Sequence, residues 1–114
     1  MINVIEHAKS ALTGILPVGV NLYTRKAPAY AVVRQVDQWF GRADNANSMQ
    51  YDLIQVDVWT NDAPDYALEK RVVKALEAAG FKRSRRNEGY DDAGAVIVHR
   101  ISQDYQFQQE YEEV

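Results

Sequence analysis

The segment YDLIQVDVWT, from Tyr51 to Thr60, alternates between two sets of side chains, as a β-strand requires. One set is apolar and consists of Ile54, Val56 and Val58. The other set is mixed and consists of Tyr51, Leu53, Gln55, Asp57 and Trp59. Because only one set is uniformly apolar, the segment predicts a strand with Ile54, Val56 and Val58 facing the core.

An amphipathic helix is predicted directly after this strand. Asp62 is a candidate N-cap, and Pro64 and Asp65 suit a first helical turn, where a missing N–H and a negative charge are tolerated. Gly80 stands where a left-handed residue ends many helices. The apolar stripe at helical spacing consists of Leu68, Val72, Ala75, Leu76 and Ala79.

Weaker patterns predict the other elements. The apolar spacing from Val4 to Thr13, with Asn3 as a cap, predicts a first helix before the break at Pro17. The further predicted strands are Asn21 to Arg25, Tyr30 to Phe40, Phe81 to Asn87 and Ala95 to Phe107. A long hairpin loop is expected over Gly41 to Ser48, a turn over Glu88 to Gly94, and a frayed acidic tail over Gln108 to Val114.

Side-chain parity within the strand from Tyr30 to Phe40 separates two mixed sets. Tyr30, Val32, Arg34, Val36 and Gln38 are expected on one face. Ala31, Val33, Gln35, Asp37 and Trp39 are expected on the other. Because neither set is purely apolar, the pattern predicts a strand exposed to a partner.

The predicted element order indicates an α+β fold. A single mixed or antiparallel sheet of about four to five strands, packed by two helices, accounts for it. The chain has 114 residues and a mass of 13.0 kDa, and it contains no internal repeat and no linker. We therefore expect residues 1–114 to form a single domain.

Composition excludes several classes of protein. The chain has no cysteine, which excludes disulfides, thiolate metal sites and a cysteine nucleophile. It has no run approaching about 18 apolar residues and no basic-then-apolar leader, so we expect neither a membrane span nor export, and a cytosolic site of synthesis. The net charge is -3, the wrong sign for a protein that wraps nucleic acid as a whole.

The residues that could carry catalysis do not form a recognisable site. His7 and His99 lack a spaced Ser or Asp partner, and the glycines form no phosphate-binding pattern. Asp52 and Asp57 differ in parity and should point to opposite faces of their strand, which argues against a shared Mg²⁺ site. We therefore expect no catalytic residues, no cofactor and no metal.

Charge is unevenly distributed along the chain. Between Lys70 and Arg86 there are seven Lys and Arg and one acidic residue, a local charge of +6, which leaves -9 for the rest of the chain. Such a segment is either a solvated surface or one that meets nucleic acid or an acidic neighbour. The candidate contact residues are Lys82, Arg83, Arg85 and Arg86 in the basic segment, Arg42 and Asp44 in the loop, and Asp104, Glu110, Glu112 and Glu113 near the C-terminus.

The block from Tyr51 to Phe81 resembles the tail-completion or tail-terminator proteins of long-tailed bacteriophages. In that family a strand of the type Y-x-[LIV]-Q-V-D-[LIV]-W-[TS] precedes a helix of the type A-L-x-x-x-V-x-x-A-L-x-x-x-G-F. Ile54 to Thr60 match the strand pattern from its third position on, and Tyr51 lies one residue farther from them than in the pattern. The helix pattern is matched here by Ala67, Leu68, Val72, Ala75, Leu76, Gly80 and Phe81. Near the N-terminus, the family's apolar helix, break and short strand are matched by LPVGVNLY, Leu16 to Tyr23.

This resemblance implies a non-enzymatic virion protein. Such proteins form a homo-oligomeric ring, usually a hexamer, that caps the tail tube and offers the surface for head–tail joining. The implied partners are further copies of the chain, the tail-tube protein and the head-connector protein, with DNA at most passing through the ring. The implied location is the phage tail or neck, after assembly in the host cytoplasm.

Two other functions remain open at this point. A small dimeric ligand-binding or regulatory module of ferredoxin-like type fits the composition. A nucleic-acid-binding accessory protein that uses the basic segment also fits, and its binding would fall steeply with salt. A ring former, a ligand-stabilised dimer and a salt-sensitive DNA binder would behave differently in solution.

Overall fold

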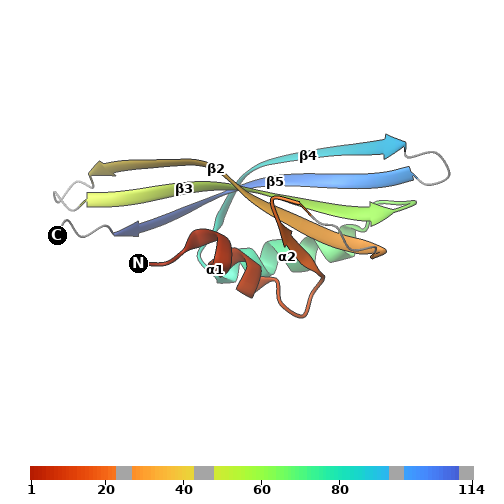
Figure 1. Cartoon of the computed structure of the whole chain (residues 1–114), viewed down its shortest axis with the longest axis horizontal. Helices are drawn as coiled ribbons and strands as arrows, with labels where there is room; N and C mark the ends of the chain where they lie inside the picture. Colours follow the sequence, from red (N-terminus) through yellow and green to blue (C-terminus); the bar gives the residue numbers. More distant parts are fainter. Residues whose placement is uncertain (23–26, 43–47, 93–96, 111–114) are drawn as a thin grey trace.

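The computed structural model describes the chain except residues 23–26, 43–47, 93–96 and 111–114. Seven elements follow one another along the described chain (Figure 1). They are α1 (Val4–Ala11), β1 (Val18–Val20), β2 (Ala29–Arg42), β3 (Ser48–Asn61), α2 (Tyr66–Ala78), β4 (Lys82–Asp92) and β5 (Ile97–Glu110). The predicted α+β class is confirmed.

The strands form one five-stranded sheet in the order β1-β2-β3-β5-β4. β1 pairs with β2 in parallel, and the other neighbours are antiparallel, so the sheet is mixed. α2 connects β3 to β4 across the intervening β5, which is a split β-α-β unit. A ferredoxin-like fold has two such units, whereas β2 and β3 here follow one another without a helix between them.

Both helices lie on one face of the sheet and cover only its middle (Figure 1). The strands β2 to β5 are long and twisted, and the sheet extends past the helices at both ends, which gives the molecule extents of 55 × 22 × 22 Å. We call the helix-covered side the helix face. The opposite side, which carries no helix of the described chain, is the open face.

The core lies between the helices and the middle of the sheet. Ile54, Val56 and Val58 of β3 are almost completely buried, as the alternation of the strand predicts. Leu68, Val72 and Leu76 of α2 pack against them, which confirms the buried stripe of the predicted helix. Gly80 has φ +97°, so it provides the predicted left-handed end of this helix.

The start of α2 differs from its prediction. Asp65 is the N-cap, because its side chain accepts a hydrogen bond from the Leu68 N–H at 3.0 Å. Asp62 lies three residues before it with φ +69° and does not cap the helix. Both positions carry an aspartate before the apolar stripe. A capping side chain accepts a hydrogen bond from the N–H three residues ahead, and Asp65 has this spacing to Leu68 whereas Asp62 does not.

The remaining elements also differ from their predicted bounds. α1 has its predicted cap at Asn3 but ends at Ala11, two residues before Thr13. The first strand of the described chain lies at Val18–Val20. Of the predicted strand Asn21 to Arg25, Asn21 has φ +66° and neither it nor Leu22 is in a strand, while Tyr23 to Arg25 lie outside the described part. The longer strands extend beyond their predicted ends into the loop and turn expected around them, and β5 continues to Glu110, into the tail expected to fray from Gln108.

A β-bulge corrects the predicted faces of β2. The register shifts between Gln35 and Asp37, so that Gln35 pairs with Ile54 and Gln38 with Asp52. Gln35 and Gln38 therefore share the helix face, although parity alone separates them. Trp39 moves in the same way to the open face, where it stacks on Tyr51 with ring centroids 5.5 Å apart.

Candidate interaction surfaces

A second bulge divides the basic residues of β4 between the two faces of the sheet. The register shifts between Arg83 and Arg85. Arg83 and Arg86 pair with Tyr105 and Gln103, whose side chains are buried on the helix face. Lys82 and Arg85 pair with Gln106 and Asp104, which lie on the open face. The four residues therefore form two surfaces and not one strip.

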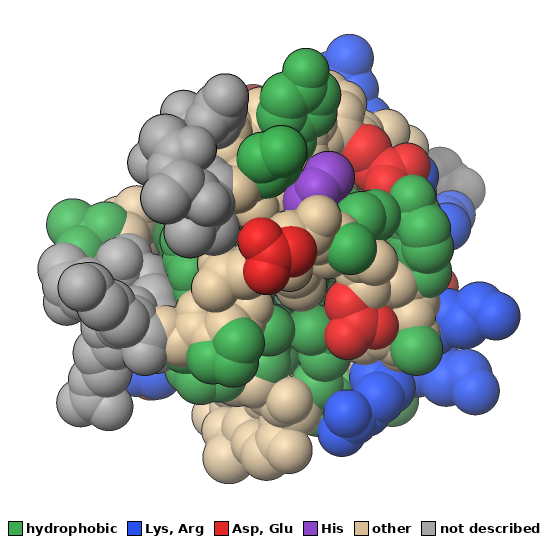
Figure 2. Space-filling view, turned by 90° about the vertical axis from the view of Figure 1, so that its right-hand side faces the viewer, with side chains coloured by type: hydrophobic (Ala, Val, Ile, Leu, Met, Phe, Trp, Pro, Cys, Tyr) green, Lys and Arg blue, Asp and Glu red, His purple; other side chains and the backbone are tan. Residues whose placement is uncertain are grey.

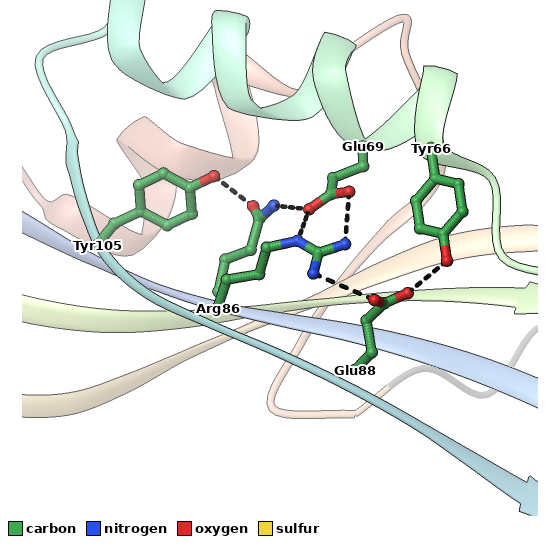
Figure 3. A network of polar contacts seen from close by, with 6 residues as sticks. Tyr66, Glu69, Arg86, Glu88 and Tyr105 are labelled. Carbon is green, nitrogen blue, oxygen red and sulfur yellow. Dashed lines mark hydrogen bonds and ion pairs between the residues drawn. The ribbon is translucent and has the colours of Figure 1, made fainter.

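Arg86 is held by two carboxylates (Figure 3). Its Nε and Nη2 donate to Glu69 of α2 at 2.5 and 3.0 Å, and its Nη1 donates to Glu88 at 3.2 Å. Two parallel bonds from a guanidinium to one carboxylate are strong and directional. Arg86 therefore fastens α2 to β4, and its guanidinium is already engaged within the chain.

The ion pair continues into a buried network (Figure 3). Gln103 donates to Glu69 at 2.9 Å, and the Tyr105 hydroxyl donates to the side-chain oxygen of Gln103. At the outer end, the Tyr66 hydroxyl donates to Glu88 at 2.8 Å. Every polar side chain of this network has a hydrogen-bond partner. The inner part of the network can therefore be buried without a large loss of folding free energy.

The electrostatic environment fixes the charge of these groups. The Arg86 hydrogen bonds hold the pKa of Glu69 below its ordinary value of 4.5, although burial acts in the opposite direction. The same bonds raise the pKa of Arg86. Burial raises the pKa of Tyr105. Glu69 and Arg86 are therefore charged and Tyr105 is neutral at neutral pH.

Acid should weaken the fold through Glu69. Because its pKa is lowered in the folded state, its contribution to stability is present above about pH 4.5 and is lost as the pH falls through the folded value. The free energy of unfolding should therefore fall less steeply below about pH 4.5 in Glu69→Gln than in the wild type. The difference is at most about 1.4 kcal/mol per pH unit. Urea titrations at several pH values measure it, and equal slopes would contradict the ion pair.

A second buried carboxylate is surrounded by amides. Asp52 of β3 is fully buried and accepts hydrogen bonds from the side chains of Gln35, Gln38 and Gln50 at 3.1, 2.8 and 2.9 Å. Gln35 also donates to the backbone oxygen of Asp37, across the bulge. The cluster therefore holds the bulged part of β2 against β3.

Replacing Asp52 by asparagine should destabilise the protein. An asparagine offers one acceptor oxygen in place of two and turns an N–H₂ group toward the glutamine amides, so that buried donors lose their partner. We expect a loss of about 1 to 3 kcal/mol. Urea denaturation measures it, with the exposed Asp91→Asn as the matched control. Equal stability of Asp52→Asn and the wild type would show that the amides find other acceptors.

The third buried carboxylate lies on the open face, opposite to Asp52, as their parity predicts. Asp57 accepts from Arg34 at 3.0 Å and from the Ser102 hydroxyl at 2.6 Å. In the described part of the chain, no three His, Cys, Asp or Glu side chains are grouped so that they could hold a metal ion. The two histidines bind backbone oxygens: His7 that of Ala79 at 2.7 Å, and His99 that of Asp62 at 3.1 Å.

A polar cavity of about 290 Å³ opens on the open face beside Arg85. It is lined by Gln55, Arg85, Asn87, Arg100, Ser102 and Asp104. The guanidinium of Arg100 lies over the ring of Trp59, 5.7 Å from its centroid. A side chain at Gly89 would place its Cβ 3.0 Å from Arg100 Nη2, so glycine leaves the space that this guanidinium fills.

The end of the molecule near the β4–β5 hairpin carries a second cavity, of about 310 Å³. Its lining consists of Pro64, Tyr66, Glu88, Gly89, Tyr90, His99 and Arg100. Figure 2 shows this end: hydrophobic and acidic side chains surround a histidine, and Lys and Arg side chains lie along one margin. Tyr90 is 68% exposed, so this end offers aromatic surface to solvent.

Of the acidic candidates that the structure describes, Asp104 lies beside a basic candidate and Glu110 does not. Asp104 is half-buried in the cavity beside Arg85, and Glu110 is exposed at the far end of β5, paired in register with Met49. Arg42 is the last residue of β2 and pairs with Ser48. Asp44, Glu112 and Glu113 lie outside the described residues. The structure thus brings together Arg85 and Asp104 and leaves Glu110 at a different place on the molecule.

Arg100 is the principal surface residue that the sequence did not reveal. It is an isolated cation in β5, outside the basic segment, and its place next to Arg85 depends on the register of β5 with β4. Its position two residues before Ser102 and four before Asp104 puts these three side chains on one face. This alternation was the only signal in the sequence that could place Arg100 with Ser102 and Asp104. It shows that Arg100 lies near Arg85 only when the pairing of β5 with β4 is known.

None of the helices that the structure describes is long and apolar enough to cross a membrane.

No protein-family model matches this chain, and no curated protein matches it. Among solved structures, it is similar to a chain of the "Virion of native gene transfer agent (GTA) particle", with 15% sequence identity and a TM-score of 0.49. That similarity covers 91% of this chain and 84% of the other. A second solved chain is 16% identical with a TM-score of 0.43, covering 96% of this chain and 90% of its own length.

Proposed function

We propose that this protein is a non-enzymatic component of a phage-like virion, which assembles into a ring that caps the tail tube and provides the head–tail joining surface. The observation that supports it most is the block from Tyr51 to Phe81. The apolar residues of this block, among them Val56 and Val58 of β3 and Val72 and Leu76 of α2, belong to one hydrophobic core cluster.

The distribution of charge supports self-association. Lys82 and Arg85 lie exposed on the open face of the edge strand β4, where they pair with Gln106 and Asp104 of β5. Glu110 lies four residues beyond Gln106 at the end of β5, and Glu112 and Glu113 follow it in the sequence. When two copies of a chain meet through two different surfaces, the contact is heterologous. Such contacts close into a ring when the rotation between neighbouring copies allows it. Complementary charges would then set the order of the copies.

The proposal predicts end-capping of tail tubes. Tail tubes from the particle that carries this protein should bind it at one end only, as seen by negative-stain electron microscopy. Tubes decorated along their length, or left without bound protein, would contradict this function. Stabilisation of a dimer by a small molecule would instead favour a regulatory module.

A further inference from the structure

We propose that the cavity between Arg85 and Arg100 binds the acidic C-terminal segment, Glu110 to Val114, of a second copy of this chain. This inference rests on the proposed self-assembly and adds to it the receptor, its ligand and the direction of the contact. The ligand chemistry is that of a short acidic peptide, whose glutamate carboxylates meet the two guanidinium groups.

The cavity has donors available for a carboxylate. The described ion pairs engage Arg34 and Arg86, and in that part of the chain none engages Arg85 or Arg100. The Nε of Arg100 is buried and has no hydrogen-bond partner. The Arg100 guanidinium lies over the Trp59 ring and beside Gly89, so it is packed on the aromatic ring and against a position that carries no side chain. A guanidinium already fixed in position loses little freedom when a carboxylate binds it.

Neutral donors complete the lining. Asn87 and Gln55 carry amide groups and Ser102 carries a hydroxyl, so a peptide that enters meets hydrogen-bonding groups on several sides of the cavity. The Ser102 hydroxyl is committed to Asp57 at 2.6 Å, which leaves the two amides as the adaptable donors. The volume of about 290 Å³ accommodates a small number of side-chain atoms, in keeping with one or two glutamate side chains.

The C-terminal segment of a chain cannot reach its own cavity. Asp104, in the cavity lining, precedes Glu110 by six residues of β5, a distance of about 20 Å along a strand. Residues 111–114 span at most about 14 Å even when fully extended. The occupant must therefore come from another copy, and because the cavity and the segment are different surfaces, the contact runs head to tail.

The negative charge of Asp104 allows a prediction about the direction in which peptide affinity changes. Its carboxylate lines the same cavity and would repel an incoming glutamate, so the two arginines must outweigh it. Removing this charge with Asp104→Asn should therefore strengthen binding of the acidic segment. A site for a cation or for a neutral ligand would show no such gain.

The test uses the labelled peptide QQEYEEV, which corresponds to Gln108 to Val114. Its receptor is the full chain with Glu112→Gln and Glu113→Gln, in which the C-terminal segments of other copies compete less for the cavity. Fluorescence anisotropy at low ionic strength should show saturable binding. Arg85→Glu should weaken it at least about tenfold and Asp104→Asn should tighten it about twofold to fivefold. The matched control Arg71→Glu, an equal charge change on α2, should alter it by less than about twofold.

Three outcomes would overturn the proposal: no binding of the peptide, equal binding of a peptide in which its glutamates are glutamine, or binding that Arg85→Glu does not weaken. Binding of duplex DNA that depends on Arg85, without peptide binding, would identify a nucleic-acid site instead. A chain that forms rings but does not bind the peptide would refute this contact and leave the ring standing. If the chain binds the peptide but never forms rings, the proposed binding site in the cavity would stand and the proposed ring would be refuted.

Discussion

Val56→Asp should unfold the protein. Val56 is completely buried in the middle strand of the sheet, inside the cluster formed by β3 and α2. The substitution removes apolar side-chain atoms from the core and introduces a carboxylate among the apolar side chains of this cluster. A buried unpaired charge costs several kcal/mol, which approaches the whole stability of about 5 to 15 kcal/mol of a small domain. We expect loss of the far-UV circular dichroism signal and of a cooperative urea transition.

The same chemical change on the surface provides the control. Val36 is 51% exposed at the β2 bulge, so Val36→Asp should change the free energy of unfolding by no more than about 0.5 kcal/mol. A folded Val56→Asp with a transition like that of the wild type would show that the register of β3, on which every face assignment depends, is wrong.

Reversing the charge of Arg83 and Arg85 should abolish assembly without unfolding the protein. Both side chains are exposed on β4, one toward each face, so neither contributes to the core. In the proposed assembly these two cations would face an acidic neighbour, so the double variant Arg83→Glu, Arg85→Glu would place like charges across the interface, which cost several kcal/mol. We expect monomers in light scattering and a melting temperature within about 4 °C of the wild type.

A matched double variant separates this contact from a general effect of charge. Lys70→Glu with Lys74→Glu changes the net charge equally, from -3 to -7, on the exposed side of α2. It should assemble as the wild type does. Assembly of the Arg83, Arg85 variant, or an equal loss in both variants, would contradict a specific role for β4. Unfolding of the Arg83, Arg85 variant would show that these residues are structural.

The central part of the fold could be predicted from the sequence because its signals are local. The alternation around Val56 and the helical spacing from Leu68 to Leu76 describe faces of single elements, and the core is built where those faces meet. The ends of elements were less predictable. Asp62 and Asp65 are both suitable caps, and only the bond from the Leu68 N–H selects Asp65.

The two bulges mark where parity fails. One extra residue near Val36 and one near Ser84 shift the side chains that follow to the other face of the sheet. A bulge leaves no consistent trace in a single sequence, since it is fixed by pairing with the neighbouring strand. For this reason Gln35 and Gln38 converge on Asp52, although an uninterrupted strand would separate them.

The candidate contact residues were predictable as a charge pattern and not as a surface. Arg86 belongs to the basic segment, yet it pairs with Glu69, which lies 17 residues away in the sequence and just outside that segment. Arg100 lies far from the segment but faces the same cavity as Arg85. Which cations are engaged and which are available depends on long-range strand and helix contacts, which composition does not encode.

The mass of the protein in solution tests the central proposal most directly. Light scattering over a concentration series, with negative-stain images of any large species, distinguishes the possible assemblies. The proposed ring predicts closed particles of about six copies, or about 78 kDa from a chain of 13.0 kDa. A stable dimer at every concentration, or a monomer that also fails to bind tail tubes, would contradict it.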